Sequence, residues 1–383
     1  MSEVPTTDRS DRIGRLQNDL SVCSRLTRAL HRDNIWDLAV AEVQMKENTE
    51  DESIMSTETD RSVFFIGNKN GGKTSIILRC IDRDEAPKPT LALEYTFGRK
   101  AKGHNTPKDI AHFWELGGGT SLLDLIQILI TSENIRTFSI VLVLDLSKPN
   151  ELWHTMDSLL QVTRKHVDKI VADIGKSDSK AANQIRQNIW RTIPNNHPDR
   201  ELIDPFPLPL LIIGSKYDIF QDFESEKRKI ISKTLRFLSH YLGASLLFTS
   251  KAESHKSVLR SFVNHLAFGQ DKSKVVSMDH NKPLIIPAGS DSLSQIGTPP
   301  ASDGDLRQVS ARTPMELWKK TYERAFPQEN KNDSKDLKDP TKDAQYAERE
   351  VDATRAVKDQ ELEQYKRNAD KSWKSMSLGL HPR

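Results

Sequence analysis

Cysteine is scarce in this sequence. Only Cys23 and Cys80 occur in 383 residues, which excludes a disulfide-stabilised extracellular scaffold and is typical of a protein of the reducing cytosol. Metal-binding motifs are missing too, because the histidines are scattered and neither H-E-x-x-H nor C-x-x-C occurs. We therefore expect no metal other than a Mg²⁺ ion that accompanies a nucleotide. We also find no nucleophile–base triad.

Long apolar runs and a strong net charge are also missing. The longest strongly apolar stretches, such as FSIVLVL at residues 138–144, are far too short to span a bilayer. Residues 1–14 are polar, so we expect no secretory signal, and acidic residues such as Asp8 and Asp11 argue against a transit peptide. The formal net charge is only +2. We therefore expect neither membrane insertion nor nucleic-acid binding.

The middle of the chain alternates strand-like and helix-like segments. Continuous apolar runs, such as residues 62–67 and 139–146, are typical of buried parallel strands. Helical periodicity separates these runs, most clearly at residues 223–241 and in a long stretch at 151–190 that is interrupted by GKSDS. The alternation predicts an α/β fold, a doubly wound and mostly parallel sheet of the P-loop, small-GTPase-like type.

The composition changes on both sides of this pattern, and the chain divides into five predicted parts. Residues 1–34 form an N-terminal arm, flexible or a docking helix, and residues 35–269 form the GTPase-like domain. Residues 270–312 are rich in Gly, Ser, Pro and Asp, which is typical of a linker. Residues 313–327 are an amphipathic docking helix. Residues 328–383 are a densely charged tail that is partly helical.

The helix at 313–327 has clear boundary signals and one aromatic face. Thr313 suits the N-cap, Pro314 the first helical position and Glu316 the capping box, while Pro327 ends the helix. In most proteins such a face packs in a core. Because loop-like segments flank this helix, we also expect it to dock, either onto its own domain or onto a partner. The face consists of Met315, Trp318, Tyr322 and Phe326.

Residues 67–74, GNKNGGKT, have the spacing of a phosphate-binding loop between a strand and a helix. Small residues such as Gly67 and Gly72 let backbone N–H groups surround a phosphate at a helix N-terminus. Lys73 would neutralise phosphate oxygens, and the Thr74 hydroxyl would bind Mg²⁺. A glycine-rich turn without a ligand is the alternative. The flanking strand and helix favour a true phosphate loop.

The segment HFWELGGGT at residues 112–120 departs from the hydrolytic motif of small GTPases, W-D-x-x-G-Q. Glu115 replaces the Asp that holds Mg²⁺, Gly118 keeps the γ-phosphate position, and Gly119 replaces the Gln that orients the attacking water. A glycine cannot position a water molecule, so we expect no efficient hydrolysis. Thr90 is the candidate switch threonine and a second Mg²⁺ ligand.

Two further segments match the positions at which GTPases read the base. GSKYD at residues 214–218 resembles [NT]-K-x-D, with Lys216 and Asp218 in place but Ser215 for Asn or Thr. TSK at residues 249–251 stands where S-A-K is usual, which makes Ser250 and Lys251 candidates. Asp145 could instead be the Walker B acid of an ATPase. We favour a strand-end Asp that caps the next turn.

Long strings in the chain resemble the dynein light intermediate chain family, in its cytoplasmic dynein 2 branch. They include FFIGNKNGGKTSIILRCIDRDEAPKPTLALEYTFG, VLDLSKPNELW, ELIDPFPLPLLIIGSKYDIFQDFESEKRK and TPMELWKK. The resemblance runs from about Ile35 to Trp373. It carries the phosphate-loop roles onto Gly67, Gly72, Lys73 and Thr74, and the departures at Glu115, Gly119 and Ser215 match a family that is not regarded as a working GTPase.

This resemblance implies a non-catalytic subunit of the dynein 2 motor. It would stabilise the heavy-chain tail, contact other dynein 2 subunits and, through the complex, the intraflagellar transport machinery. Its roles would be retrograde transport, cilium assembly and length control, with locations in the cytoplasm, cilium, axoneme, basal body and centrosome. Bound GTP or GDP with Mg²⁺, held without turnover, is the expected cofactor. The alternative is a regulatory GTP-binding switch with slow hydrolysis.

Overall fold

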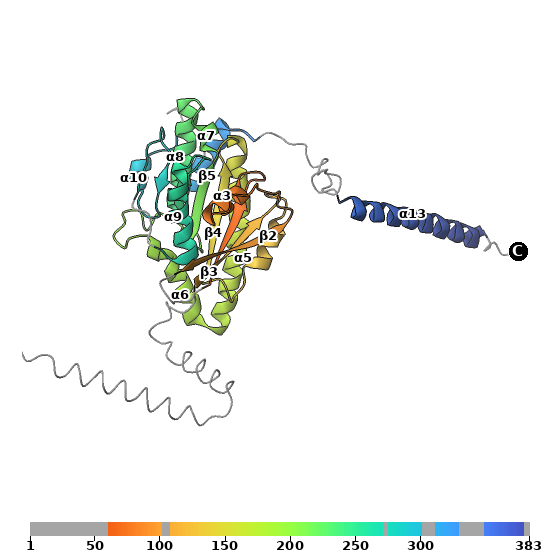
Figure 1. The fold of residues 1–383 in the computed structure, drawn as a ribbon. Coiled ribbons are helices and arrows are strands. Elements are labelled where there is room, and N and C mark those ends of the chain that lie inside the picture. Colours follow the sequence, from red (N-terminus) through yellow and green to blue (C-terminus); the bar gives the residue numbers. More distant parts are fainter. Residues whose placement is uncertain (1–59, 102–107, 271–274, 301–310, 329–347, 379–383) are drawn as a thin grey trace, which may run out of the picture. The chain divides into compact units, whose positions relative to one another are not determined.

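The computed structural model describes residues 60–101, 108–270, 275–300, 311–328 and 348–378, with side chains up to residue 369. The predicted N-terminal arm, residues 1–34, lies outside these described residues. The chain divides into two units, one up to Pro327 and one from Gln328. All strands that the structure describes belong to the first unit (Figure 1).

A seven-stranded sheet with the order β2-β3-β1-β4-β5-β6-β7 forms the centre of the first unit. The central strands β3, β1, β4, β5 and β6 run parallel. The outer strands β2 and β7 run antiparallel to β3 and β6. This arrangement confirms the predicted doubly wound, mostly parallel sheet. The strands are β1 (Arg61–Gly67), β2 (Leu93–Ala101), β3 (Lys108–Leu116), β4 (Phe138–Asp145), β5 (Leu210–Ser215), β6 (Ser245–Phe248) and β7 (Ile285–Ile286).

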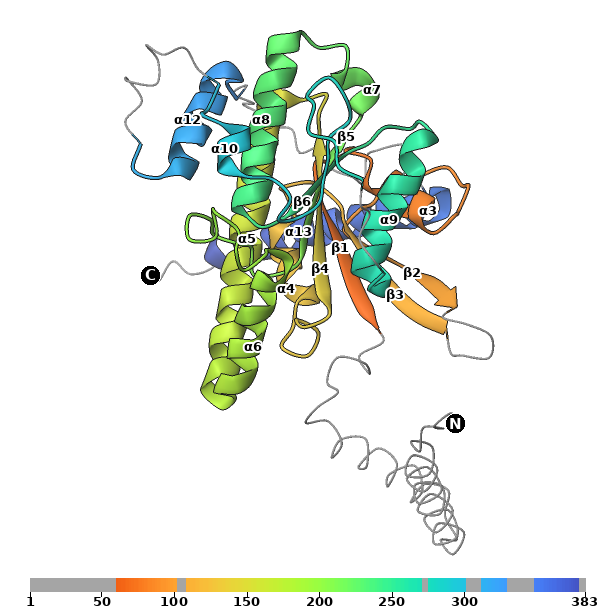
Figure 2. The ribbon, with the colours of Figure 1, turned by 90° about the vertical axis from the view of Figure 1, so that its left-hand side faces the viewer.

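Helices cover both faces of the sheet, as Figure 2 shows. One core cluster includes Leu152, Leu235 and Trp318, from helices α5, α8 and α12. The second includes Ile77 and Phe262, from helices α3 and α9 on the other face. Among the described residues, the helices of this unit are α3 (Lys73–Cys80), η1 (Leu123–Leu125), α4 (Ile126–Leu129), α5 (Pro149–Ser177), α6 (Ser179–Ile189), η2 (Trp190–Thr192), α7 (Tyr217–Phe220), α8 (Ser225–Tyr241), α9 (Ser254–Phe268), α10 (Leu293–Ile296) and α12 (Pro314–Ala325).

The central strands follow from the continuous apolar runs of the sequence. All eight residues of β4 are buried, so neither face of this strand contacts water. Strand β1 ends at Gly67, where an added Cβ would lie 1.9 Å from the Val143 carbonyl oxygen. No side chain fits in that space, and φ is +141°. The glycine therefore lets the chain turn into the loop at residues 67–74 while it presses against β4.

The predicted linker at 270–312 contains ordered structure, which corrects that part of the sequence analysis. Its residues supply β7 and α10, and Leu284, Ile286 and Ile296 are buried in the core. The buried Asp291 carboxylate accepts two hydrogen bonds of 2.8 Å from Arg236 on α8. Apolar residues are too sparse here to give a periodic pattern. Composition alone therefore suggested a linker.

Helix α12 belongs to the first unit and packs against the other helices of that unit. Trp318 stacks on Phe237 of α8, with ring centroids 4.6 Å apart, and the Tyr322 hydroxyl donates a 2.9 Å hydrogen bond to the Pro149 carbonyl. Trp318, Tyr322 and Phe326 are buried, and Met315 packs against the same cluster. The core-packing interpretation of this face is confirmed. A partner-docking role for the three buried side chains is wrong, because the domain's own core already covers them.

The second unit contains one described helix, α13 (Arg349–Leu378). Residues 348–368 are exposed, including Val351, Val357, Leu362 and Tyr365. The tail is therefore partly helical, as predicted from its sequence. None of the helices that the structure describes is both long and apolar enough to cross a membrane.

The stacking of α12 leads to a stability prediction. Trp318→Ala should lower the free energy of unfolding by about 3 to 5 kcal/mol, because it removes a buried aromatic side chain and leaves a cavity. Urea denaturation followed by circular dichroism measures the change. The control is Tyr365→Ala, because Tyr365 is 71% exposed and should change stability by less than about 0.5 kcal/mol. Equal effects of the two substitutions would contradict the docking of α12.

Candidate nucleotide-binding site

The loop at residues 67–74 has the geometry of a phosphate cradle. It joins β1 to α3, and Gly72 at the start of α3 has a left-handed backbone with φ of +92°. An added Cβ at Gly72 would meet no atom within 4 Å, so the backbone faces open space at this point. The Gly71 N–H donates to the Asn68 carbonyl at 3.0 Å and closes the turn. The first N–H groups of α3 therefore lie beside open space, as an anion site requires.

Lys73 lies inside this loop. Its ammonium donates to the Asn68 carbonyl at 2.9 Å and to the Gly67 carbonyl at 3.5 Å, and the side chain is buried. The structure thus places the predicted phosphate-binding lysine at the cradle. Its role toward a phosphate stays a prediction.

Asn68 ties the loop to the sheet and to α5. Its side-chain oxygen accepts from the Asp145 N–H at 3.1 Å, and its amide nitrogen donates to the Thr155 hydroxyl at 3.1 Å. The sequence analysis missed this residue. Asn68 occupies a variable position of the motif, and its partners lie more than 70 positions further along the chain. Only the fold brings them together.

The two candidate Mg²⁺ ligands converge on Glu115, at the end of β3. The Thr74 hydroxyl donates to the Glu115 carboxylate at 3.0 Å, and Thr90 lies near enough to Glu115 to lower its pKa. The Thr90 hydroxyl donates its hydrogen bond to Glu94 at 2.9 Å. Two hydroxyls and a carboxylate are the hard oxygen donors that Mg²⁺ prefers. These residues therefore suit a nucleotide with Mg²⁺. The Mg²⁺ ion would neutralise the negative charge of the phosphates.

Burial opposes the charges of both ionisable groups at this site. It lowers the pKa of Lys73, and the nearby Glu115 carboxylate acts in the opposite direction. Burial likewise raises the pKa of Glu115, while Lys73, Thr74 and Thr90 act to lower it. A phosphate group would favour the charged form of Lys73, and a cation would favour the charged form of Glu115. A bound nucleotide with a cation would therefore offset the free-energy cost of burying these two charges.

Gly119, at the position where the sequence comparison with small GTPases predicts a water-orienting glutamine, has little space around it. Its backbone is left-handed, with φ of +66°, and an added Cβ would lie 3.0 Å from the Lys69 backbone nitrogen. Gly117 is more confined still, since its Cβ would lie 2.5 Å from the Thr90 carbonyl oxygen. A side chain at Gly119 would thus strain the backbone and crowd the phosphate loop. The local packing explains why glycine suits this position.

The candidate base-reading loop follows β5. Lys216 has a left-handed backbone and forms an ion pair with the buried Asp145. The other oxygen of Asp145 accepts from the N–H and hydroxyl of Ser147, at 3.0 and 2.6 Å. Asp145 thus caps the turn after β4, as the sequence analysis favoured. Its ion pair with Lys216 was not predicted, because Asp145 ends β4 and Lys216 lies in the loop after β5, 71 positions further along the chain. Asp218 is exposed.

The structure brings the TSK segment next to this loop. The Tyr217 N–H donates to the Thr249 carbonyl at 3.0 Å, so residues 216–218 and 249–251 lie side by side. Ser250 is held by its neighbours, since its hydroxyl lies 3.0 Å from His255 Nδ1 and its carbonyl accepts from Arg79 at 2.9 Å. Lys251 is exposed. The four candidates therefore gather at one place, while their contact with a base stays a prediction.

Comparisons with known proteins agree on one family. The family model described as Dynein light intermediate chain (DLIC) matches residues 31–194. The chain is 63% identical to cytoplasmic dynein 2 light intermediate chain 1 of Bos taurus over 346 residues, which is 90% of this chain and 99% of that protein. It is 62% identical to the Homo sapiens protein of the same name, with the same coverage.

A solved structure supports the fold. The crystal structure of the dynein light intermediate chain's conserved domain matches with a TM-score of 0.52 and 18% sequence identity. The match covers 70% of this chain and 97% of that one. At this identity the likeness concerns the fold alone, and it agrees with the predicted α/β class.

The confinement of Gly119 leads to a test that separates crowding from backbone strain. Gly119→Ala and Gly72→Ala both place a Cβ on a left-handed backbone, which destabilises the fold by about 1 to 2 kcal/mol. Only Gly119→Ala also brings that Cβ within 3.0 Å of a backbone atom. We expect it to be the less stable variant in urea denaturation without nucleotide. A more stable Gly119→Ala protein would contradict the geometry described for this position.

Proposed function

The chain belongs to the dynein light intermediate chain family, and we propose on this basis that it is a non-catalytic accessory subunit of cytoplasmic dynein 2. The high identity to dynein 2 light intermediate chains, over 99% of the length of each of those two relatives, carries the proposal. A short shared motif could recur in unrelated proteins, but a match of this extent includes both the domain and the tail.

The proposed role is to bind and stabilise the tail of the dynein 2 heavy chain. Other dynein 2 subunits would be further partners, and the intraflagellar transport machinery would be reached through the complex. The motor would then serve retrograde transport, cilium assembly and control of cilium length. The protein would be found in the cytoplasm, at the basal body and centrosome, and along the ciliary axoneme.

The proposal that the subunit is non-catalytic rests on the loop after β3, which contains Gly119. Gly119 has no side chain that could orient water, and its surroundings leave little room for one. The Glu115 carboxylate accepts a hydrogen bond from the Thr74 hydroxyl. We propose that a bound GTP or GDP with Mg²⁺ acts as a fixed part of the fold. A ligand at 100 times its dissociation constant adds about 2.7 kcal/mol of stability without any turnover.

A regulatory GTP-binding switch is the second candidate. The cradle at Gly72, the buried Lys73 and the oxygen donors of Thr74 and Thr90 favour it, because a switch needs all of them. The two candidates differ in one measurable respect. A switch must release one nucleotide state and bind another, whereas a fixed ligand stays bound and unchanged.

Heavy-chain binding can be tested by co-expression with the tail of a dynein 2 heavy chain. We expect the full chain to co-purify with the tail, because the proposed subunit stabilises it. Truncation after Pro327 removes the second unit but keeps α12, which a cut at residue 312 would remove from the core. Binding by the truncated protein assigns the contact to the first unit, and loss of binding assigns it to the second. A folded full chain that does not bind would refute the proposal.

Nucleotide use can be tested on the same complex. The protein is denatured, the released nucleotide is identified by chromatography, and the GTPase rate is measured over many turnovers. We expect GTP or GDP in a ratio of one per chain with no turnover, and its loss in Lys73→Ala together with a lower melting temperature. Lys251→Ala, an exposed position, is the folding control. Steady turnover that Lys73→Ala abolishes would favour the switch instead.

A further inference from the structure

Strand β2 leaves one edge of the sheet without a neighbouring strand. It stands first in the strand order, and among the described residues it pairs with β3 alone. Figure 2 shows it at the margin of the sheet. The strand is nine residues long, and five of these residues are exposed. Natural proteins usually shorten, bend or cover such an edge, because its free N–H and C=O groups can pair with another strand. A long exposed edge strand therefore calls for a partner.

One face of β2 presents an ordered aromatic row to solvent. Tyr95 is 45% exposed and Phe97 is 37% exposed. The Tyr95 hydroxyl lies 2.8 Å from His112 Nδ1, and its ring centroid lies 4.8 Å from that of Trp114. The Arg99 guanidinium lies over the Phe97 ring, 4.9 Å from its centroid. Because side chains alternate along a strand, residues 95, 97 and 99 share this face. The row is fixed by its neighbours on β3 while its outer side stays open.

The other face of β2 carries one acidic and one basic residue. Glu94 and Lys100 stand three positions before and after Phe97, the middle residue of the strand. On β3, Glu94 faces the Glu115 carboxylate, and the charge of Glu94 acts to raise the pKa of Glu115. Like charges directly opposite one another destabilise a sheet. A cation on the free side of Glu94 would offset this repulsion.

The sequence of β2 is complementary to itself when two copies run antiparallel. In a two-fold symmetric pair, each residue faces the one equally far from the middle on the opposite side. With all nine residues overlapping, Phe97 faces its own counterpart in the other copy. Tyr95 then faces Arg99, which allows a cation–π contact. Glu94 faces Lys100, an attractive pair of opposite charges. The last two pairs each occur twice, and moving the axis by one residue in either direction separates both.

We propose that β2 pairs with β2 of a second copy of this chain, antiparallel and centred on Phe97, so that two sheets join into one. Charges that only protect an edge need no particular order along the strand. Here an acid and a base stand symmetrically about the middle, so they face each other in this register. One pair of strands is a small contact compared with a standard interface of about 800 Å² per partner. The dimer is therefore weak and reversible.

Sedimentation of the full chain over a concentration series tests the pairing. We expect a monomer–dimer equilibrium. Glu94→Lys and Lys100→Glu should each raise the dissociation constant of the dimer about tenfold or more, because two attractive pairs become repulsive. A mixture of the two variants should restore the dimer, since every lysine then faces a glutamate, and this rescue also shows that both variants fold. An unaltered chain that stays monomeric, or a mixture that does not associate, would overturn the proposal.

A disulfide test fixes the register. Phe97→Cys and its matched control Tyr95→Cys are made in a Cys23→Ser background, which leaves the buried Cys80 as the other cysteine. The sulfurs introduced at position 97 face each other on the axis. Those introduced at position 95 lie four positions apart, roughly 13 Å along the strands, which is too far for a disulfide. Under mild oxidation we expect a covalent dimer of Phe97→Cys and a monomer of Tyr95→Cys. Equal cross-linking of the two variants, or none in either, would overturn the pairing.

Discussion

The contact between β1 and β4 at Gly67 is the constraint on which the site depends. The two strands approach so closely there that a Cβ would lie 1.9 Å from the Val143 carbonyl. This approach sets where the loop at residues 67–74 leaves the sheet, and Asn68 then fixes the loop to β4 and α5 by hydrogen bonds. The position of the Lys73 side chain depends on the same geometry, because its ammonium donates to the carbonyls of Gly67 and Asn68. The cradle is thus a consequence of strand packing.

That packing also creates the electrostatic character of the site. Lys73 and Glu115 are both buried, and burial opposes the charge of each. Their mutual attraction offsets only part of this effect, because buried ion pairs gain little unless further hydrogen bonds satisfy them. Thr74 supplies such a bond to Glu115. The site is satisfied internally, and it is also suited to an anion beside Lys73 with a cation beside Glu115. Both properties agree with a ligand that stabilises the fold.

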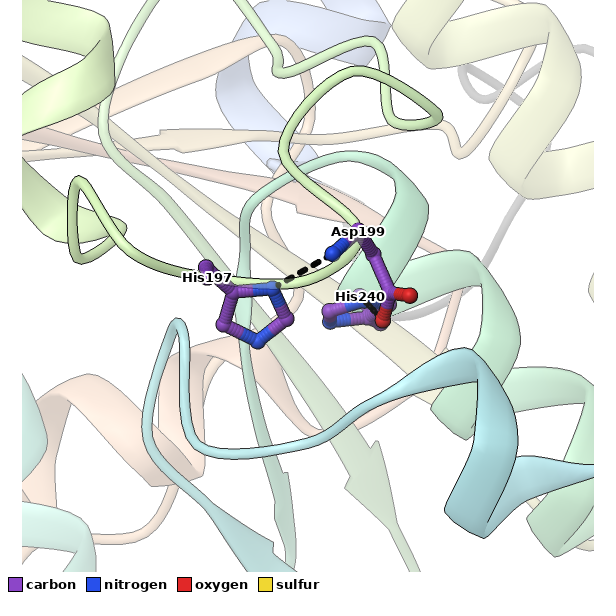
Figure 3. Close-up of side chains that lie close together, drawn as sticks. All are labelled: His197, Asp199 and His240. Carbon is purple, nitrogen blue, oxygen red and sulfur yellow. Dashed lines mark hydrogen bonds and ion pairs between the residues drawn. The ribbon is translucent and has the colours of Figure 1, made fainter.

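The sequence predicts best those features that repeat along a chain. Buried strands such as β4 and the capped helix α12 follow from local periodicity and cap residues, and the structure has both. Features that depend on contact between distant segments are missed. The Lys216–Asp145 ion pair joins the loop after β5 to the end of β4, and the His197, Asp199 and His240 cluster joins a loop to α8 (Figure 3). The segment of β7 and α10 is missed for another reason, since a few buried side chains among Gly, Ser and Pro give no period.

The additions to the GTPase-like sheet agree with the proposal of a domain that holds a fixed arrangement and does not switch. A switch needs segments with two arrangements of similar free energy. Here the segment of the candidate switch threonine is tied by the Thr90 hydrogen bond to Glu94, and the candidate base-reading loop is tied by the ion pair of Lys216 with Asp145. On the α8 side, α10 and α12 add the Arg236–Asp291 pair and the Trp318 stack. Each contact favours one arrangement over any alternative. A domain built in this way suits a subunit whose surface must stay constant while its partners move.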